Sequence, residues 1–185
     1  MADISITIRQ GDSILARYGN QLAYLSDVEA KTVFARALNH EGDKGRTQVK
    51  RELVTATGIK YSLINRGMAT HRANKGRLEY RLDQKGSETN LGLFNARATG
   101  KGVSAAPWNK RQIFRGDNPS RGSFFLPGTK LVFIRVGAPR YPIKPLFGPN
   151  LAREIVKDKP AAAWTAVATS LADRIGHEIG RLLPG

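Results

Sequence analysis

The stretch Ser26–Gly58, SDVEAKTVFARALNHEGDKGRTQVKRELVTATG, contains the longest helical pattern of the chain. Ser26 suits a helix N-cap, because its hydroxyl can accept a hydrogen bond from a free amide of the first turn. Apolar residues recur every three or four positions before Gly42 and again after Gly45, as on the buried face of a helix, and Gly58 suits the C-cap. Glycine is a poor helix former, so we expect one long helix that is kinked or interrupted near Gly42–Gly45.

Alternating patterns outside this stretch predict β-strands. Apolar and polar residues alternate over Asp3–Arg9 and over Arg77–Leu82, which is the period of a half-buried strand. In the second segment the two leucines and Tyr80 should face inward. Lys130–Val136 is apolar on both faces, so we expect a central strand there. Shorter runs bounded by Gly, Pro or Asn predict edge or loop strands at Leu91–Arg97, Val103–Trp108 and Arg111–Arg115, and an edge strand or extended arm at Tyr141–Pro149.

Further helices are expected on either side of these strands. A short helix is expected over Ser62–Met68, and Pro149 and Asn150 can start another. Pro160 suits the first position of the last helix, or a kink. Strands grouped between helices are typical of an α+β fold. We therefore expect a long N-terminal helix and a C-terminal helix packed on a mostly antiparallel sheet with Gly/Pro-rich loops. The apolar stripe of the last helix is Trp164, Val167, Ala168, Leu171, Ile175, Ile179 and Leu182.

The length of 185 residues fits a single domain, residues 1–185. Within it we expect a basic, loop-rich insertion at about 98–128, where Asp117–Gly122 has the composition of an exposed loop. The absence of cysteine excludes disulfides, thiolate metal sites and a cysteine nucleophile. The N-terminus lacks the pattern of a signal peptide, and no apolar run approaches the roughly 20 residues of a membrane span. We expect a soluble protein that works in a reducing compartment.

Charge is the strongest global signal. The chain carries 30 Lys and Arg against 15 Asp and Glu, a net charge of +15 and a pI of about 10.6. Residues 41–147 hold 21 of the basic and 7 of the acidic residues, whereas the segments on either side are nearly neutral. A polyanion is therefore expected nearby: nucleic acid, an acidic protein surface or anionic lipid. Lipid is disfavoured, because the basic residues do not gather on one helix face opposite Trp and Leu. The residues expected to face DNA or an acidic partner are Lys50, Arg51, Arg66, Arg72, Arg77, Lys110, Arg111, Arg115, Arg121, Arg140 and Lys144.

Catalytic motifs are not recognisable in the sequence. The three histidines have no metal-ligand spacing, and there is no phosphate loop, dinucleotide fingerprint or nucleophile elbow. Glu79 and Asp83 could in principle hold Mg²⁺ in a nuclease. They alternate with Arg77 and Arg81 on one strand, however, and charge pairing explains that pattern better. We expect no enzyme, no metal site and no cofactor.

A sequence-specific DNA reader is not expected either, because no helix-turn-helix with a recognition helix is recognisable. Contact with DNA would then be to the phosphate backbone and would weaken with salt. The aromatic residues that could form a stacking platform for single strands are interpreted mostly as core; these are Phe94, Trp108, Phe114, Phe124, Phe125 and Phe133.

The order of elements and one specific segment carry a family resemblance. The segment is Arg140–Pro149, RYPIKPLFGP. It follows a helix ending in Phe34–Asn39, a second helical stretch, Thr47–Thr57, and the strand Arg77–Leu82. From about Val28 to the C-terminal helix, the chain resembles the minor tail protein Z family of long-tailed phages and prophages, also called tail completion proteins.

The resemblance implies a non-enzymatic virion structural protein of a bacteriophage tail, assembled in the host cytoplasm. Such a minor tail protein would complete the head-proximal tail end, at the neck, and help head–tail joining. By analogy it would form an oligomeric ring, a hexamer, around the DNA path. Its partners would be other copies of itself, tail terminator, tail tube or head-completion proteins, and genomic DNA through backbone contacts, with no membrane. The residues alone leave two alternatives: a free-standing, non-sequence-specific nucleic-acid-binding protein, and a metal-dependent nuclease.

Overall fold

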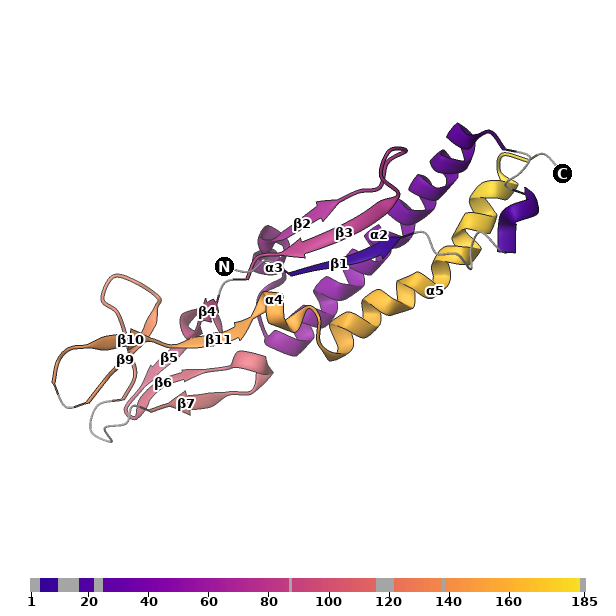
Figure 1. Ribbon diagram of the computed structural model, residues 1–185. Helices are drawn as coiled ribbons and strands as arrows, with labels where there is room; N and C mark the ends of the chain where they lie inside the picture. Colours follow the sequence, from indigo (N-terminus) through magenta and orange to yellow (C-terminus); the bar gives the residue numbers. More distant parts are fainter. Residues whose placement is uncertain are drawn as a thin grey trace.

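The computed structural model describes residues 4–9, 17–21, 25–86, 88–115, 122–137 and 139–183. Two long helices, α2 (Asp27–Thr57) and α5 (Asp158–Gly180), lie side by side and antiparallel, with a small sheet against them (Figure 1). The remaining strands extend away from the helix pair at one end. The expected α+β class, with a long N-terminal helix and a C-terminal helix, is confirmed.

The N-terminus of α2 is capped as the sequence predicts. The amide of Glu29 donates to Oγ of Ser26 at 3.3 Å, and the amide of Ser26 donates to the Glu29 carboxylate at 2.9 Å. This reciprocal pair satisfies two amides that have no partner within the helix. At the other end Gly58 adopts a left-handed conformation (φ 75°) and donates its N–H to the carbonyl of Val54.

The expected kink or interruption near Gly42–Gly45 is wrong, because α2 runs unbroken through both glycines. The glycines serve packing instead. A Cβ at Gly42 would lie 2.4 Å from Cγ of Tyr80, and one at Gly45 would lie 2.8 Å from Cγ2 of Val167. Residues without a side chain are therefore required where a strand and the partner helix approach the α2 backbone.

The sheet against the helix pair has the strand order β1 (Ile4–Arg9), β3 (Glu79–Gln84), β2 (Met68–His71), with antiparallel neighbours. The central strand β3 buries Tyr80, Leu82 and Gln84 on one face. It starts two residues later than the alternation predicts, and Leu78, expected to face inward, lies half-buried just before it. The short helix α3 (Tyr61–Gly67) precedes β2, one residue away from its predicted position.

Between β3 and the C-terminal helices the chain forms what we call the β lobe, residues 88–150. It contains three small antiparallel sheets in place of one larger sheet. Its elements are β4 (Glu88–Asn90), the 3₁₀ turn η1 (Leu91–Leu93), β5 (Arg97–Thr99), β6 (Gly102–Ala105), the 3₁₀ turn η2 (Pro107–Asn109), β7 (Gln112–Phe114), β8 (Phe124–Phe125), β9 (Val132–Arg135), β10 (Ile143–Pro145) and β11 (Phe147–Asn150). The pairings are β4 with β11, β5–β6–β7, and β8–β9–β10.

Several strand predictions for the β lobe hold, and two are wrong. Val103–Trp108, expected as an edge or loop strand, holds most of β6, which is the buried central strand of its sheet, and then enters the 3₁₀ turn η2. The segment 132–135 is the central strand of its sheet, and the segments 112–114 and 143–145 are edge strands. The predicted strand Leu91–Arg97 is instead mainly a 3₁₀ turn. Asn90 caps this turn by accepting a hydrogen bond from the amide of Gly92 at 2.9 Å. A Cβ on Gly92 would lie 1.6 Å from the carbonyl oxygen of Lys130, so the turn presses directly against the β8–β9 connection.

Side-chain amides hold the β lobe together and fix it to the end of the helix pair. Asn109 donates to the last carbonyls of α2. Asn90 accepts from the amide of Val132 at 2.8 Å and donates to its carbonyl at 3.1 Å. The Asn90 contact satisfies buried backbone groups of Val132 that would otherwise have no partner. These side-chain contacts position the three short sheets, whose strands pair over only a few residues.

The chain returns to the helix pair through α4 (Leu151–Glu154), whose N-cap is Asn150, as expected. In α5, Pro160 is the third residue and not the first. Two residues expected on its buried stripe, Ala168 and Leu182, are exposed. The other five members of that stripe are buried.

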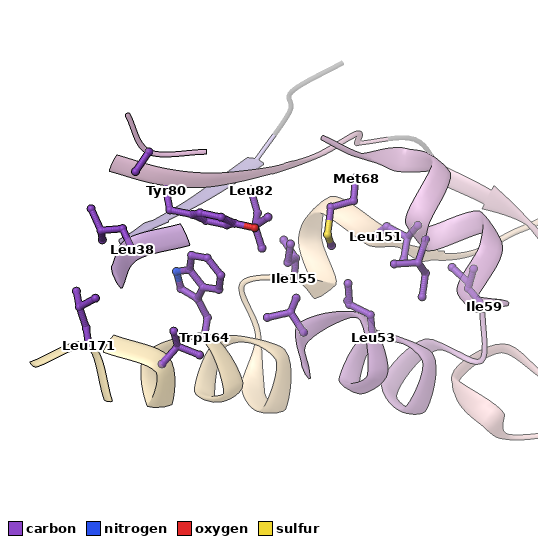
Figure 2. Packing of buried hydrophobic residues seen from close by; sticks show 14 of the residues in the cluster. Leu38, Leu53, Ile59, Met68, Tyr80, Leu82, Leu151, Ile155, Trp164 and Leu171 are labelled. Carbon is purple, nitrogen blue, oxygen red and sulfur yellow. The ribbon is translucent and has the colours of Figure 1, made fainter. Parts of the chain in front are cut away.

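Buried side chains from both helices and from β3 meet in one cluster that continues into the β lobe. Figure 2 shows Tyr80 and Trp164 facing each other between Leu38 and Ile155, and their ring centroids lie 6.1 Å apart. Aromatic pairs at this spacing add stabilisation beyond the area that they bury.

A buried carboxylate ties α2 to α5. Glu41 is only 3% exposed, and it accepts hydrogen bonds from Nζ of Lys44 at 2.9 Å and from Oγ of Ser170 at 2.7 Å. Nδ1 of His40 lies 2.9 Å from the same carboxylate. Burial alone would raise the pKa of Glu41, but these hydrogen bonds outweigh it and hold the pKa below its ordinary value.

Replacing Gly42 with Ala is expected to destabilise the protein, although Ala is the better helix former. The Cβ would overlap the ring of Tyr80, and overpacking of this kind costs about 2 kcal/mol of the free energy of unfolding. Chemical denaturation measures the loss. Gly180→Ala in α5 is the matched control, because an added Cβ there would meet no other element within 4 Å, and it should be neutral or stabilising. Equal effects of the two substitutions would contradict the packing role of Gly42.

Replacing Glu41 with Gln is expected to lower the free energy of unfolding by about 2 kcal/mol at pH 7, since charge-assisted hydrogen bonds are lost. The pKa of Glu41 is lower in the folded state than its ordinary 4.5. The contribution of ionised Glu41 to the free energy of unfolding is therefore complete above pH 4.5. It disappears as the pH falls through the lowered pKa that Glu41 has in the folded state. Denaturation curves from pH 7 to pH 3 should show the difference between the two proteins shrinking. A difference that stays constant across that range would contradict this role.

Candidate nucleic-acid interface

The β lobe carries most of the excess positive charge, and Glu88, its first residue, is its one carboxylate before residue 91. Residues 91–150 contain ten basic residues and a single acidic one, Asp117. They supply 9 of the 15 net positive charges of the chain. The ten are Arg97, Lys101, Lys110, Arg111, Arg115, Arg121, Lys130, Arg135, Arg140 and Lys144.

Ion pairing differs sharply between the β lobe and the helical half. In the helical half several basic residues pair with carboxylates, as Arg17 does with Asp173, Arg81 with Asp83 and Lys157 with Glu154. In the part of the β lobe that the structure describes, no basic residue takes part in an ion pair. Its positive charges are therefore available to an external anion.

The β5–β6–β7 sheet separates a core face from an outer face. Val103 is buried, and it pairs with Ala98 on one side and with Phe114 on the other. The three side chains therefore lie on the same face of the sheet. On the outer face Arg97 and Ile113 flank Ser104. Arg111 also reaches Ser104: its Nη1 donates to the hydroxyl at 3.2 Å.

The β8–β9–β10 sheet presents its charges in a different way. The guanidinium of Arg135 lies over the ring of Phe124, 4.4 Å from the centroid. Lys144 is exposed on the edge strand β10. Arg140, just before that strand, lies over the ring of Tyr141 at 5.8 Å. A guanidinium that stacks on an aromatic ring can still donate to phosphate or carboxylate oxygens; Arg140 is exposed, whereas Arg135 is half-buried and its Nε is buried.

The structure brings together only part of the predicted set. Lys110, Arg111 and Arg115 flank β7, and Arg140 and Lys144 belong to β10 and its approach, all in the β lobe. The other exposed members lie on the helical half: Arg51 on α2, Arg66 on α3, Arg72 after β2 and Arg77 before β3. Arg121 lies outside the described residues.

Two of the residues on the helical half already have anionic partners. Arg72 forms an ion pair with Asp43. Arg77 contacts the carboxylate of Glu79 at 3.1 Å. Their charge is therefore largely compensated within the protein.

The prediction that Lys50 lies on the binding surface is wrong, because its side chain is buried and only 3% exposed. Its Nζ donates to Oδ1 of Asn65 and lies 5.8 Å from the ring centre of Tyr61. Burial, with a smaller contribution from Arg46, lowers the pKa of Lys50. The residue is a structural contact between α2 and α3.

Four cations of the β lobe were missed as site residues by the sequence analysis: Arg97, Lys101, Lys130 and Arg135. A local count of acidic residues could have found them. The segment 91–150 is almost free of Asp and Glu, whereas the segment 41–90 holds six of them.

Trp108 is the exception among the aromatic residues interpreted as core. It is 45% exposed and has a positive φ of 52° in η2. The neighbouring Asn109 holds this turn in place, since its Nδ2 donates to the carbonyl of Thr55 at 2.6 Å near the end of α2. Phe94 is buried as expected, and the other four aromatic residues are half-buried.

Glu79 and Asp83 contact arginines, as the charge-pairing interpretation predicts: Glu79 contacts Arg77 and Asp83 contacts Arg81. His71 also lies 2.8 Å from Asp83. Among the described residues no group of three or more His, Asp or Glu could hold a metal ion. None of the helices in the described part of the chain is both long and apolar enough to cross a membrane.

Comparisons with protein-family models, with curated proteins and with solved structures gave no match for this chain. What the β-lobe surface can bind is therefore inferred from its own residues and their arrangement. This surface is extended and spread over two small sheets, and it is rich in arginine and lysine without carboxylate partners. Such a surface can hold successive phosphates of a nucleic-acid backbone.

A matched pair of triple variants tests whether the β lobe binds polyanions. Lys110→Ala, Lys130→Ala and Lys144→Ala together remove three charges from the β lobe. Arg36→Ala, Arg51→Ala and Lys159→Ala remove three exposed charges from the helices. Binding to a mixed-sequence 20-bp duplex, measured by fluorescence anisotropy at several salt concentrations, should weaken only for the first triple variant. The slope of log K against log salt should become shallower by about 2.7, at about 0.9 for each lost phosphate contact. Equal losses for both variants would show that only the net charge matters.

Proposed function

We propose that this protein is a structural component of a bacteriophage tail, which completes the head-proximal end of the tail and helps to join tail to head. In this proposal it acts as an oligomeric ring around the DNA path, and the β lobe faces the DNA or an acidic neighbour. It is a virion protein, assembled in the host cytoplasm, without enzymatic activity. Its partners are other copies of itself and tail terminator, tail tube or head-completion proteins.

The observation that carries the proposal is the one-sided charge. Residues 91–150 carry nine net positive charges, and their described cations take part in no ion pair, which favours a polyanion close to them. The resemblance of Arg140–Pro149 and of the element order to the tail completion family supplies the biological setting. The segment itself forms the extended arm expected from the sequence: its edge strand β10 carries Lys144, and β11 leads into the C-terminal helices.

A free-standing nucleic-acid-binding protein is the alternative that the same charge supports. It would bind bare duplex as a monomer, with non-specific dissociation constants on the order of 10⁻⁴ to 10⁻⁶ M at physiological salt. It would need no tail protein. Oligomeric state and assembly phenotype therefore separate the two functions.

Deletion of the gene from the phage or prophage that encodes it is expected to leave separate heads and tails, because the joining end of the tail is incomplete. Electron microscopy of lysates measures the fraction of joined particles, and a plasmid copy should restore it. Electron microscopy of the protein incubated with the isolated tails should show it at the head-proximal end. Joined particles in normal number after deletion would contradict the proposal. So would a protein that remains monomeric both alone at high concentration and with tails.

A further inference from the structure

A groove runs between α3 and the β lobe. One hollow of about 640 Å³ lies between α3, η1 and the β8–β9 connection. A second, of about 500 Å³, lies between α3, the end of β3 and β4. Leu63 and Leu93 line both hollows, so the two are neighbours, and we call them together the α3 groove.

The floor and walls of the α3 groove are largely aliphatic. Ile59 and Leu151 are buried beneath it, and Leu63 is half-buried in its wall. At its edges Leu93 and Leu131 are 43% and 41% exposed. Large aliphatic side chains gathered on a concave surface are typical of a binding site for apolar groups.

The groove also contains a buried amide without a partner. Gln84, on β3, is fully buried and lines the second hollow, yet neither Nε2 nor Oε1 makes a hydrogen bond. Gly67 lines the same hollow, and a Cβ there would lie 2.7 Å from Nε2 of Gln84, so no side chain separates the amide from α3. An unpaired buried carboxamide is costly. One donor and one acceptor from a peptide group would satisfy it.

The rim of the α3 groove is positively charged. Lys60, Arg66, Lys85 and Lys130 surround it, with Glu88 as the single carboxylate. None of the four cations takes part in an ion pair among the described residues. An occupant with carboxylates on either side of its apolar groups would match this rim.

We propose that the α3 groove binds an extended segment of a partner protein in which leucine-like side chains are flanked by Asp and Glu. The aliphatic side chains would fill the floor, a main-chain amide would pair with Gln84, and the carboxylates would meet the rim. Nucleic acid fits less well, because a phosphate backbone offers nothing to the leucines at the edges. This inference concerns a protein partner and does not require the tail function.

The test uses the full chain and three acetylated and amidated peptides. The probe is SDELLDLE; one control, SDESSDSE, keeps the charges and lacks the leucines, and the other, SKKLLKLK, keeps the leucines and reverses the charges. The readouts are the side-chain amide resonances of Gln84 in ¹⁵N NMR, assigned with a Gln84→Met variant, and peptide anisotropy. The probe should shift the Gln84 resonances and bind at least tenfold more tightly than either control.

Protein variants complete the test. Leu93→Ser with Leu131→Ser should weaken binding of the probe at least tenfold, and both residues are exposed enough that the fold should tolerate the change. Ile113→Ser with Val156→Ser is the matched control, since both residues are exposed but lie outside the groove, and it should leave binding unchanged. No binding at 1 mM peptide, equal binding of a control peptide, or unshifted Gln84 resonances would overturn the proposal. A 20-bp duplex that shifts the Gln84 resonances more than the probe would also overturn it, in favour of nucleic acid.

Discussion

The close packing of side chains from β3 and α5 against the α2 backbone at Gly42 and Gly45 is the constraint on which the structure rests. Tyr80 from β3 lies against the first glycine, and Trp164 and Val167 from α5 lie against the second. The two rings then meet each other at 6.1 Å and fill the space between helix pair and sheet. A side chain at either glycine would move the sheet or α5 away from α2. The core therefore depends on the two glycines of α2. It holds the helix pair together, and the β lobe is fixed to the end of that pair.

Sequence reasoning succeeded where local chemistry determines the structure. The caps of α2 follow from Ser26 and Gly58, which act within a few residues. It failed where the cause lies far along the chain. The continuity of α2 through its glycines is explained by Tyr80 and Trp164, and the turn that replaces a predicted strand in the β lobe is explained by a carbonyl of the β8–β9 connection.

The same distinction applies to the candidate interface. Composition alone predicts that a positive surface exists, but not which cations have partners. Lys50 sits beside Val49 on the buried side of α2, where helical periodicity already argues against exposure. Arg72 is neutralised by Asp43, 29 positions away, a contact that no spacing rule indicates. The nearly acid-free composition of residues 91–150 was visible in the sequence and is the better guide to the surface.

The uneven pairing of charges gives the molecule an electric dipole. The residues outside 91–150 carry 6 of the 15 net positive charges and pair several of their cations with carboxylates, whereas residues 91–150, at the other end, carry 9, and their described cations take part in no ion pair. A polyanion exerts a torque on such a molecule before any contact forms, within a range set by the Debye length of about 8 Å at physiological ionic strength. The protein would then arrive with the β lobe foremost, and added salt would slow its association more than it would speed its release. The orientation in which the protein approaches a polyanion is therefore determined by the segment of the chain that lacks carboxylates.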